Sequence, residues 1–131
     1  MTVNPDGSIE DKQPENLDEV VDMMIELIKE QNVENQVAKK GIAHHGPGTS
    51  IRNNLNLWWQ EDWPKLYNIP KPPLVEWFNK RKIFHADDMS GTITEAVQAK
   101  LNEKKFDVDE HLKKYFKHWK ELGYKDGIFT N

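Results

Sequence analysis

The sequence predicts an all-α protein: an irregular bundle of five or six helices with a proline-rich loop packed on it. Apolar residues recur at helical spacing in several segments, whereas the alternating runs typical of strands are scarce. Residues that cap or stop helices flank most of these segments. From the length of 131 residues we expect one helical domain at 16–125, a flexible acidic leader at 1–15 and a tail at 126–131.

Composition and charge exclude several classes of protein. The chain has no cysteine, which excludes disulfides, a thiolate nucleophile and cysteine-bound metals. No apolar run approaches the roughly 20 residues of a membrane span, and residues 1–16 are too acidic for a targeting peptide. Residues 1–30 carry nine acids and two bases, whereas residues 31–131 carry thirteen acids and sixteen bases. Because no basic stripe dominates, nucleic-acid binding is not expected, and we expect a cytoplasmic protein.

The first two helices are well marked in the sequence. Asn16 is a candidate N-cap with Glu19 three residues later, and the helix that follows is expected to end near residues 30–32. Its apolar side chains share one face: Leu17, Val20, Val21, Met24, Leu27 and Ile28. A second, shorter helix is expected at 33–42, where basic residues and Gly41 mark its end.

The following segment predicts a tight turn and a third helix. Residues 44–48 are two histidines followed by Gly-Pro-Gly, a combination that breaks the helical pattern. Thr49 or Ser50 is a candidate cap for a helix that continues through Trp58 and Trp59.

A proline-rich loop is expected at 63–73, which contains four prolines. Its apolar residues Leu66, Tyr67 and Ile69 are expected to lie against the core. Prolines suit the first turn of a helix, so a short helix is expected at 74–80.

Two longer helices complete the prediction. An acid-rich turn at Asp87 and Asp88 opens a helix through Leu101, in which Gly91 indicates close packing or a ligand. The last helix is expected at 107–123, with an aspartate at its start, a glutamate three residues later and a glycine at its end.

The first group of residues that could carry chemistry surrounds the turn at 44–50. A glycine-containing turn that leads into a helix presents free backbone N–H groups, which makes it an anion site by geometry. The side chains that would add donors are those of His44, His45, Thr49, Ser50 and Arg52. The alternative interpretation is a helix cap with surface histidines. The segment is not a P-loop, because it lacks the Gly-Lys-Ser/Thr ending.

The second group is His85, Asp87 and Asp88. One histidine and two carboxylates could bind a divalent metal or orient a base. The two acids could equally be helix N-terminal residues placed for the helix dipole. His44 or His45 would complete a metal site, although no His-x-x-x-His or His-Glu-x-x-His spacing supports one.

The third group is aromatic. Trp58, Trp59, Trp63 and Trp77 lie within twenty residues and could stack on a base or anchor a partner protein. The alternative is that these rings belong to the core. On a helix, the adjacent Trp58 and Trp59 would point about 100° apart, so one of them is expected to reach a pocket or an interface.

No set of catalytic residues emerges from the sequence. The serines and threonines lack the context of a nucleophile, and the adjacent Asp87 and Asp88 cannot straddle a sugar. We interpret His111 and His118, which are seven residues apart, as part of a solvated basic face that could oppose the acidic first helix.

Two segments resemble an uncharacterised family of small bacterial and phage domains. Members of this family carry a Leu-His-Phe-Gly-Leu-Gly turn, then Ile-Arg-Asn and Leu-Trp, and later His-Pro-Asp-Asp-Ala-Ser before a helix. The matching residues are His44, Gly46, Gly48, Ile51, Arg52, Asn53, Leu57, Trp58, His85, Asp87, Asp88 and Ser90. The residues that differ are His45, Pro47, Ala86 and Met89. The resemblance spans roughly residues 17–101 and implies no particular activity.

The resemblance links the two polar groups to each other. Shared histidine, arginine, asparagine and aspartate residues suggest a binding site more than a core. The competing interpretation is a buried structural network in which Arg52 forms an ion pair with Asp87 or Asp88.

From these observations we expect a non-enzymatic protein that binds an anionic small molecule, either a nucleotide or a phosphorylated metabolite. A phage or mobile-element protein that sequesters a nucleotide would fit this size and polarity. The expected ligand-binding residues are His44, His45, Gly48, Thr49, Ser50, Arg52, Asn53, Trp58, His85 and Asp87. No catalytic residue, resident metal or cofactor is predicted.

Two alternatives belong to other functional classes. One is a protein-interaction module, such as an inhibitor, an adaptor or an immunity-type protein, whose acidic leader meets a basic partner. The other is a metal-dependent hydrolase that uses His44, His45, His85 and Asp87. A homodimer is compatible with the aromatic content, and no membrane association is expected.

Overall fold

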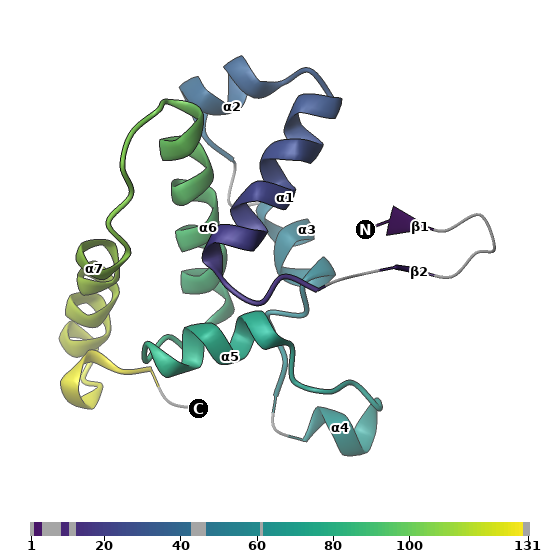
Figure 1. Ribbon diagram of the computed structural model, residues 1–131. Coiled ribbons are helices and arrows are strands. Elements are labelled where there is room, and N and C mark those ends of the chain that lie inside the picture. Colours follow the sequence, from purple (N-terminus) through teal and green to yellow (C-terminus); the bar gives the residue numbers. More distant parts are fainter. Residues whose placement is uncertain (1, 4–8, 11–12, 43–46, 61, 130–131) are drawn as a thin grey trace.

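The computed structural model of this chain describes residues 2–3, 9–10, 13–42, 47–60 and 62–129 (Figure 1). Within these residues the chain forms seven α-helices, one 3-10 turn (η1, Lys125–Gly127) and two very short strands. The α-helices are α1 (Leu17–Glu30), α2 (Glu34–Lys40), α3 (Pro47–Asn54), α4 (Trp63–Leu66), α5 (Pro73–Lys80), α6 (Ala86–Leu101) and α7 (Val108–Glu121). The predicted all-α class is confirmed, with seven α-helices in the described residues where five or six were expected.

The two strands lie in the acidic leader. β1 (Thr2–Val3) pairs antiparallel with β2 (Ile9–Glu10), so that Val3 stands opposite Ile9. A flexible leader was expected here from the sequence, and this strand pair was not predicted. Its sequence signals are β-branched residues on either side of Pro-Asp-Gly at 5–7, a combination that favours turns.

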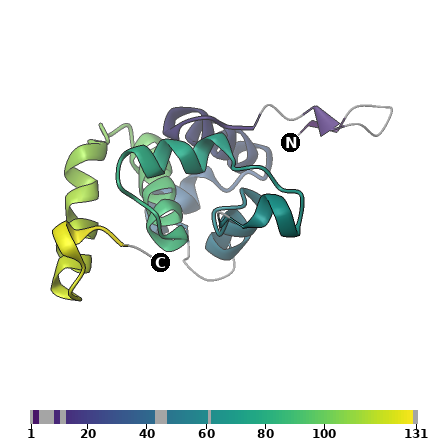
Figure 2. The same ribbon diagram turned by 90° about the horizontal axis from the view of Figure 1, so that it is seen from below.

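Helix α6 is the central element of the bundle. Figures 1 and 2 show α1 and α3 on one side of α6 and α7 on the other, and α2 also packs against it. Ile93 and Val97 of α6 are fully buried, as is Phe78 of α5. The other buried apolar residues of the core are Leu17, Val20, Val21, Ile28, Ile51, Leu57, Leu74, Val75, Ile83, Ala86, Met89, Ala96 and Leu112.

Local capping chemistry sets the ends of several helices as predicted. The Asn16 side chain accepts a hydrogen bond of 2.9 Å from the Glu19 backbone N–H at the start of α1. Asp107 does the same for the Glu110 N–H at the start of α7, at 3.1 Å. Gly41 follows α2 with a φ of 73°, a conformation that suits glycine.

Helix α3 differs from its prediction at both ends. It begins at Pro47 rather than after a Thr49 or Ser50 cap, and it ends at Asn54 instead of continuing through the two tryptophans. Asn56 takes a φ of 53°, and the Leu57 N–H donates to the Arg52 carbonyl at 2.9 Å. The chain turns at this point and buries Leu57 in the core. The free energy gained by burying Leu57 outweighs the helical pattern of the sequence.

The proline-rich segment contains a fourth helix that the sequence did not predict. Helix α4 starts at Trp63, and its Pro64 is tolerated because the first turn of a helix needs no N–H there. The expectation that Leu66 and Tyr67 lie against the core is wrong, because their exposed fractions are 62% and 63%. The segment is instead held through Ile69, whose carbonyl accepts a 3.0 Å hydrogen bond from the Trp59 indole.

Close packing explains the glycine inside α6. A Cβ atom at Gly91 would lie 2.6 Å from the phenolic oxygen of Tyr115 on α7, so a larger residue would force the Tyr115 side chain to move. Of the two explanations offered by the sequence, close packing is therefore the one confirmed.

The α-helices are short or polar. Among the residues that the structure describes, no helix is long and apolar enough to cross a membrane.

Candidate functional site

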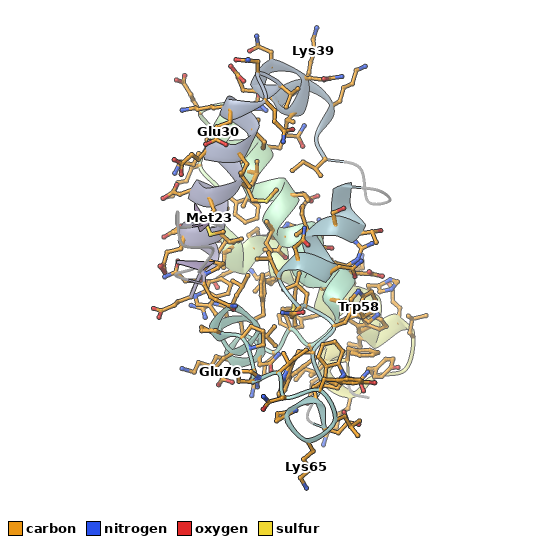
Figure 3. The ribbon with its side chains drawn as sticks, turned by 90° about the vertical axis from the view of Figure 1, so that its right-hand side faces the viewer. Met23, Glu30, Lys39, Trp58, Lys65 and Glu76 are labelled. Atoms are coloured by element: carbon orange, nitrogen blue, oxygen red, sulfur yellow. The ribbon has the colours of Figure 1, made fainter. Side chains whose placement is uncertain are left out.

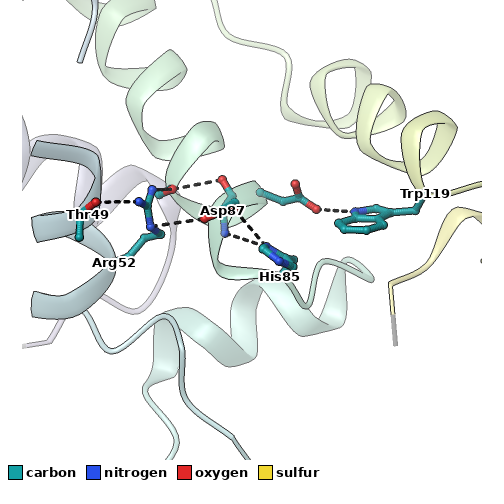
Figure 4. Close-up of polar contacts among 7 residues, drawn as sticks. Thr49, Arg52, His85, Asp87 and Trp119 are labelled. Carbon is teal, nitrogen blue, oxygen red and sulfur yellow. Dashed lines mark hydrogen bonds and ion pairs between the residues drawn. The ribbon is translucent and has the colours of Figure 1, made fainter. Parts of the chain in front are cut away.

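Arg52 is the centre of a buried polar network that joins α3 to the start of α6 (Figure 4). Only 5% of this residue is exposed. Its Nη1 donates to Ser90 Oγ at 3.1 Å and its Nη2 donates to Thr49 Oγ1 at 3.0 Å. Its Nε lies 3.4 Å from Asp87 Oδ1. Two of the guanidinium nitrogens thus donate hydrogen bonds to protein hydroxyls, and the third lies within ion-pairing distance of a carboxylate.

His85 caps helix α6 and fixes its own tautomer in doing so. Its Nδ1 accepts a 3.0 Å hydrogen bond from the Asp87 backbone N–H, so the proton of the neutral ring resides on Nε2. Aromatic rings surround this imidazole. The ring centroids of Trp58, Trp119 and Phe129 lie 5.8, 5.5 and 4.9 Å from that of His85. Asp87 and Asp88 lie in the first turn of α6, as predicted, while His85 supplies the cap.

Asp88 belongs to the same end of α6 but faces α7. It is 8% exposed, and its Oδ2 accepts a 2.6 Å hydrogen bond from the Trp119 indole N–H. Burial raises the pKa of this carboxyl, because the charged form loses hydration. The indole, His85 and His118 oppose that shift by favouring the carboxylate, and Asp87 adds to it.

The pKa of Asp88 gives a prediction for stability against pH. A carboxyl whose folded pKa exceeds its unfolded value binds its proton more tightly when folded, so its protonation stabilises the folded chain as the pH falls. Only the wild type gains this stabilisation. The free energy of unfolding of Asp88→Asn, relative to the wild type, should therefore fall between pH 7 and pH 4, measured by urea denaturation. A difference that is constant across this range would contradict the buried-carboxyl assignment.

A second polar group joins α6 to α7 and was missed by sequence reasoning. The Nε2 of His111 lies 3.2 Å from Thr92 Oγ1, and its Nδ1 lies 2.6 Å from Glu95 Oε2. The side chain of His111 is 7% exposed, so the expected solvated face is wrong at this position. Burial and the Lys114 ammonium lower the pKa of His111, against the pull of Glu95. Helix α7 packs on α6 rather than opposing α1.

The order hydroxyl, imidazole and carboxylate in this second group matches that of a catalytic triad. Thr92, however, is fully buried, and its hydroxyl already donates to the Asp88 carbonyl at 2.8 Å. Burial also raises the pKa of Tyr115, a neighbour of Thr92. A nucleophile must meet its substrate and pass its proton to the base, and Thr92 can do neither. The group attaches α7 to α6.

The structure brings together only part of the predicted site. Thr49, Arg52, His85 and Asp87 form one network, and Trp58 packs on the histidine. Gly48 lies in the first turns of α3, while the side chains of Asn53 and Ser50 are exposed. His44 and His45 lie outside the described residues. Within the described part of the chain, no group of three or more histidine and acidic residues could hold a metal ion.

An apolar cavity of about 860 Å³ lies where α1, α2 and α3 meet, and we call it the α1–α3 cavity. Figure 3 views this face of the molecule, with Met23 labelled on α1. The apolar lining residues are Pro14, Val20, Met23, Met24, Leu27, Ile28, Val33, Val37, Ile42, Ile51 and Leu55. The polar ones are Gln13, Gln31, Gln36, Lys40, Ser50 and Asn54. Of the predicted binding residues that the structure describes, Ser50 lines this cavity.

A smaller cleft of about 680 Å³ has a different character. It lies between the start of α1, the end of α5 and the loop after α6, and Asp18, Asp22, Lys100 and Lys104 line it with Arg81. Lys100 pairs with Asp22. The Arg81 guanidinium stacks on Trp77, 3.6 Å from the ring centroid. Acidic and basic side chains both line this cleft, whereas the α1–α3 cavity is mostly apolar.

These features define a small helical domain with a closed polar network and an open apolar cavity. A family model described as a domain of unknown function (DUF6794) matches residues 13–101, and the chain belongs to this family. The match takes in α1 to α6, including the Arg52 network and the α1–α3 cavity, whereas α7 follows it. No curated protein and no solved structure matches the chain.

Proposed function

We propose that this protein is a non-enzymatic binding protein that holds a small molecule with an apolar body in the α1–α3 cavity. The observation that carries this proposal is the cavity itself. Its volume of about 860 Å³ falls within the roughly 300–1,000 Å³ of pockets that bind small molecules. Its lining, mostly aliphatic and thioether side chains with a few amides, is the composition such pockets have.

The Arg52 network is a weaker candidate for the ligand site. A phosphate would have to displace Asp87 and the two hydroxyls that already match the guanidinium. A hydrogen bond to a charged group contributes about 1.5–3 kcal/mol, so the ligand would have to offset the loss of these contacts. We therefore still propose a non-enzymatic binding protein. The proposed site is now the α1–α3 cavity, and the proposed ligand is an apolar compound rather than a nucleotide.

The cavity wall suits a ligand that is flexible or only loosely defined in shape. Met23 and Met24 are unbranched and polarizable, and methionines adapt to irregular apolar surfaces. Leu27 is 47% exposed, a large fraction for a leucine beside a core. Covering such a surface with an apolar ligand gains about 25 cal/mol per Å² removed from water.

Filling the cavity tests this proposal. Leu27→Trp should weaken the binding of decanol, used as an apolar probe, by about tenfold or more, because the indole occupies ligand volume. The position is half exposed, so the fold should tolerate the change. The matched control is Leu66→Trp, another exposed leucine, which lies on α4 and does not line the cavity. Isothermal titration calorimetry on the full chain measures both variants.

Three outcomes of this titration are informative. Weakened binding in Leu27→Trp with unchanged binding in Leu66→Trp supports the cavity. Equal effects of the two substitutions would place decanol elsewhere. Absence of decanol binding to the wild type at millimolar concentration would overturn the proposal.

The exposed side chains of α4 favour a second candidate, the protein-interaction module. Leu66 and Tyr67 expose more than half of their surface, and Trp63 stacks edge-on against Tyr67. Exposed aromatic and aliphatic side chains of this kind act as anchors at protein interfaces. Capture of a host protein that the double variant Leu66→Asp/Tyr67→Ser no longer retains would favour this function over the first.

A further inference from the structure

We infer that the ligand of the α1–α3 cavity is an anionic amphiphile, with an apolar chain in the cavity and a carboxylate or similar head beside Lys40. This inference rests on the proposed function and names the chemical class of its ligand.

The charged residues around the cavity indicate whether the head group of the ligand is anionic or cationic. Among the lining residues that the structure describes, Lys40 is the only charged one and none is a carboxylate. The remaining polar lining groups are amides and one hydroxyl, which are neutral. A cationic head would therefore find no counter-charge at this site, whereas an anionic head would find one.

Lys40 is placed to act at the mouth of the cavity. It lies in the last turn of α2 and is exposed, so its ammonium stays hydrated while its stem borders the apolar lining. Among the described residues no carboxylate lies within ion-pairing distance of this ammonium, although the chain carries 22 acidic residues. An anionic head could thus pair with Lys40 without first breaking an ion pair inside the protein.

A neutral polar group beside Lys40 would complete the head-group site. Gln36 precedes Lys40 by one helical turn and also lines the cavity. Residues four apart lie on the same face of a helix, so Gln36 and Lys40 are neighbours. Their side chains offer N–H donors to the oxygens of a carboxylate.

The neighbouring lysine supplies a matched control. Lys39 is also exposed and stands in the same last turn of α2, but it does not line the cavity (Figure 3). Lys39→Gln and Lys40→Gln remove the same charge from adjacent positions. Their effects on net charge and on the helix dipole are therefore equal, and only a specific contact can separate them.

The test is calorimetric titration of the full chain with decanoate, decanol and decylammonium, which share one apolar chain. We expect decanoate to bind the wild type about fivefold more tightly than decanol, and decylammonium to bind most weakly. Lys40→Gln should remove the preference for decanoate and leave decanol within twofold. Lys39→Gln should leave the affinities for all three compounds unchanged.

The outcomes separate this inference from the proposed function. If decanol and decanoate bind equally, or if the two lysine variants behave alike, the anionic class is wrong while the apolar cavity stands. If none of the three compounds binds the wild type, the proposed function itself fails.

Discussion

Replacing Arg52 with alanine should lower the free energy of unfolding by about 2–3 kcal/mol, because it removes a buried guanidinium and leaves the Ser90 and Thr49 hydroxyls without their donor. Ser90 is 2% exposed and would lose the donor that reaches it from Arg52. The junction between α3 and the start of α6 depends on these contacts (Figure 4). Urea denaturation followed by circular dichroism measures the loss.

Two controls separate charge from geometry at this position. Arg52→Lys keeps the charge but cannot direct donors at three groups, so we expect it to recover less than half of the loss. Arg81→Ala removes the only other arginine of the chain, which stacks on Trp77, and should cost about 1 kcal/mol. An Arg52→Ala variant within about 1 kcal/mol of the wild type would show that the network does not hold the junction.

Replacing Trp119 with alanine should cost about 3 kcal/mol and loosen α7. The indole stacks against His85, Tyr124 and Phe129, and it donates to the buried Asp88 carboxylate. Helix α7 buries little apolar surface of its own, since Leu112 is its one buried residue. Loss of the indole therefore removes a large share of what fixes α7 to α6.

Hydrogen exchange measures this effect residue by residue. In Trp119→Ala the amides of 108–121 should exchange faster, while those of α1 keep their protection. Leu122→Ala is the control, because Leu122 is 61% exposed and its removal should change stability by less than about 0.5 kcal/mol. Unaltered exchange in α7 of the tryptophan variant would mean that other contacts hold this helix.

The parts of the fold that could be predicted from sequence are those that depend on near neighbours. The caps at Asn16 and Asp107 act on backbone groups three residues away, so sequence spacing reveals them. The end of α3 could not be predicted, because it follows from the burial of Leu57 among residues distant in sequence. Helix α4 could not be predicted either, because none of its residues is buried and so no buried face marks it in the sequence.

The candidate site also has parts that could be predicted from the sequence and parts that could not. An ion pair of Arg52 with Asp87 or Asp88 was one interpretation that the sequence allowed, and the structure contains the pair with Asp87. The burial of His111 was not predictable, because its surroundings come from Thr92 and Glu95 on another helix. The α1–α3 cavity is a space between helices, and apolar periodicity shows which faces are buried but not how completely they are filled.

The most direct test of the account is to locate an apolar probe on the protein by NMR. Full-length protein with bound decanol should give intermolecular nuclear Overhauser effects to the methyl groups of Met24, Val37 and Ile51, which line the α1–α3 cavity. Contacts from decanol to Trp58 and His85 instead, with none to these methyl groups, would contradict the assignment of the cavity as the binding site.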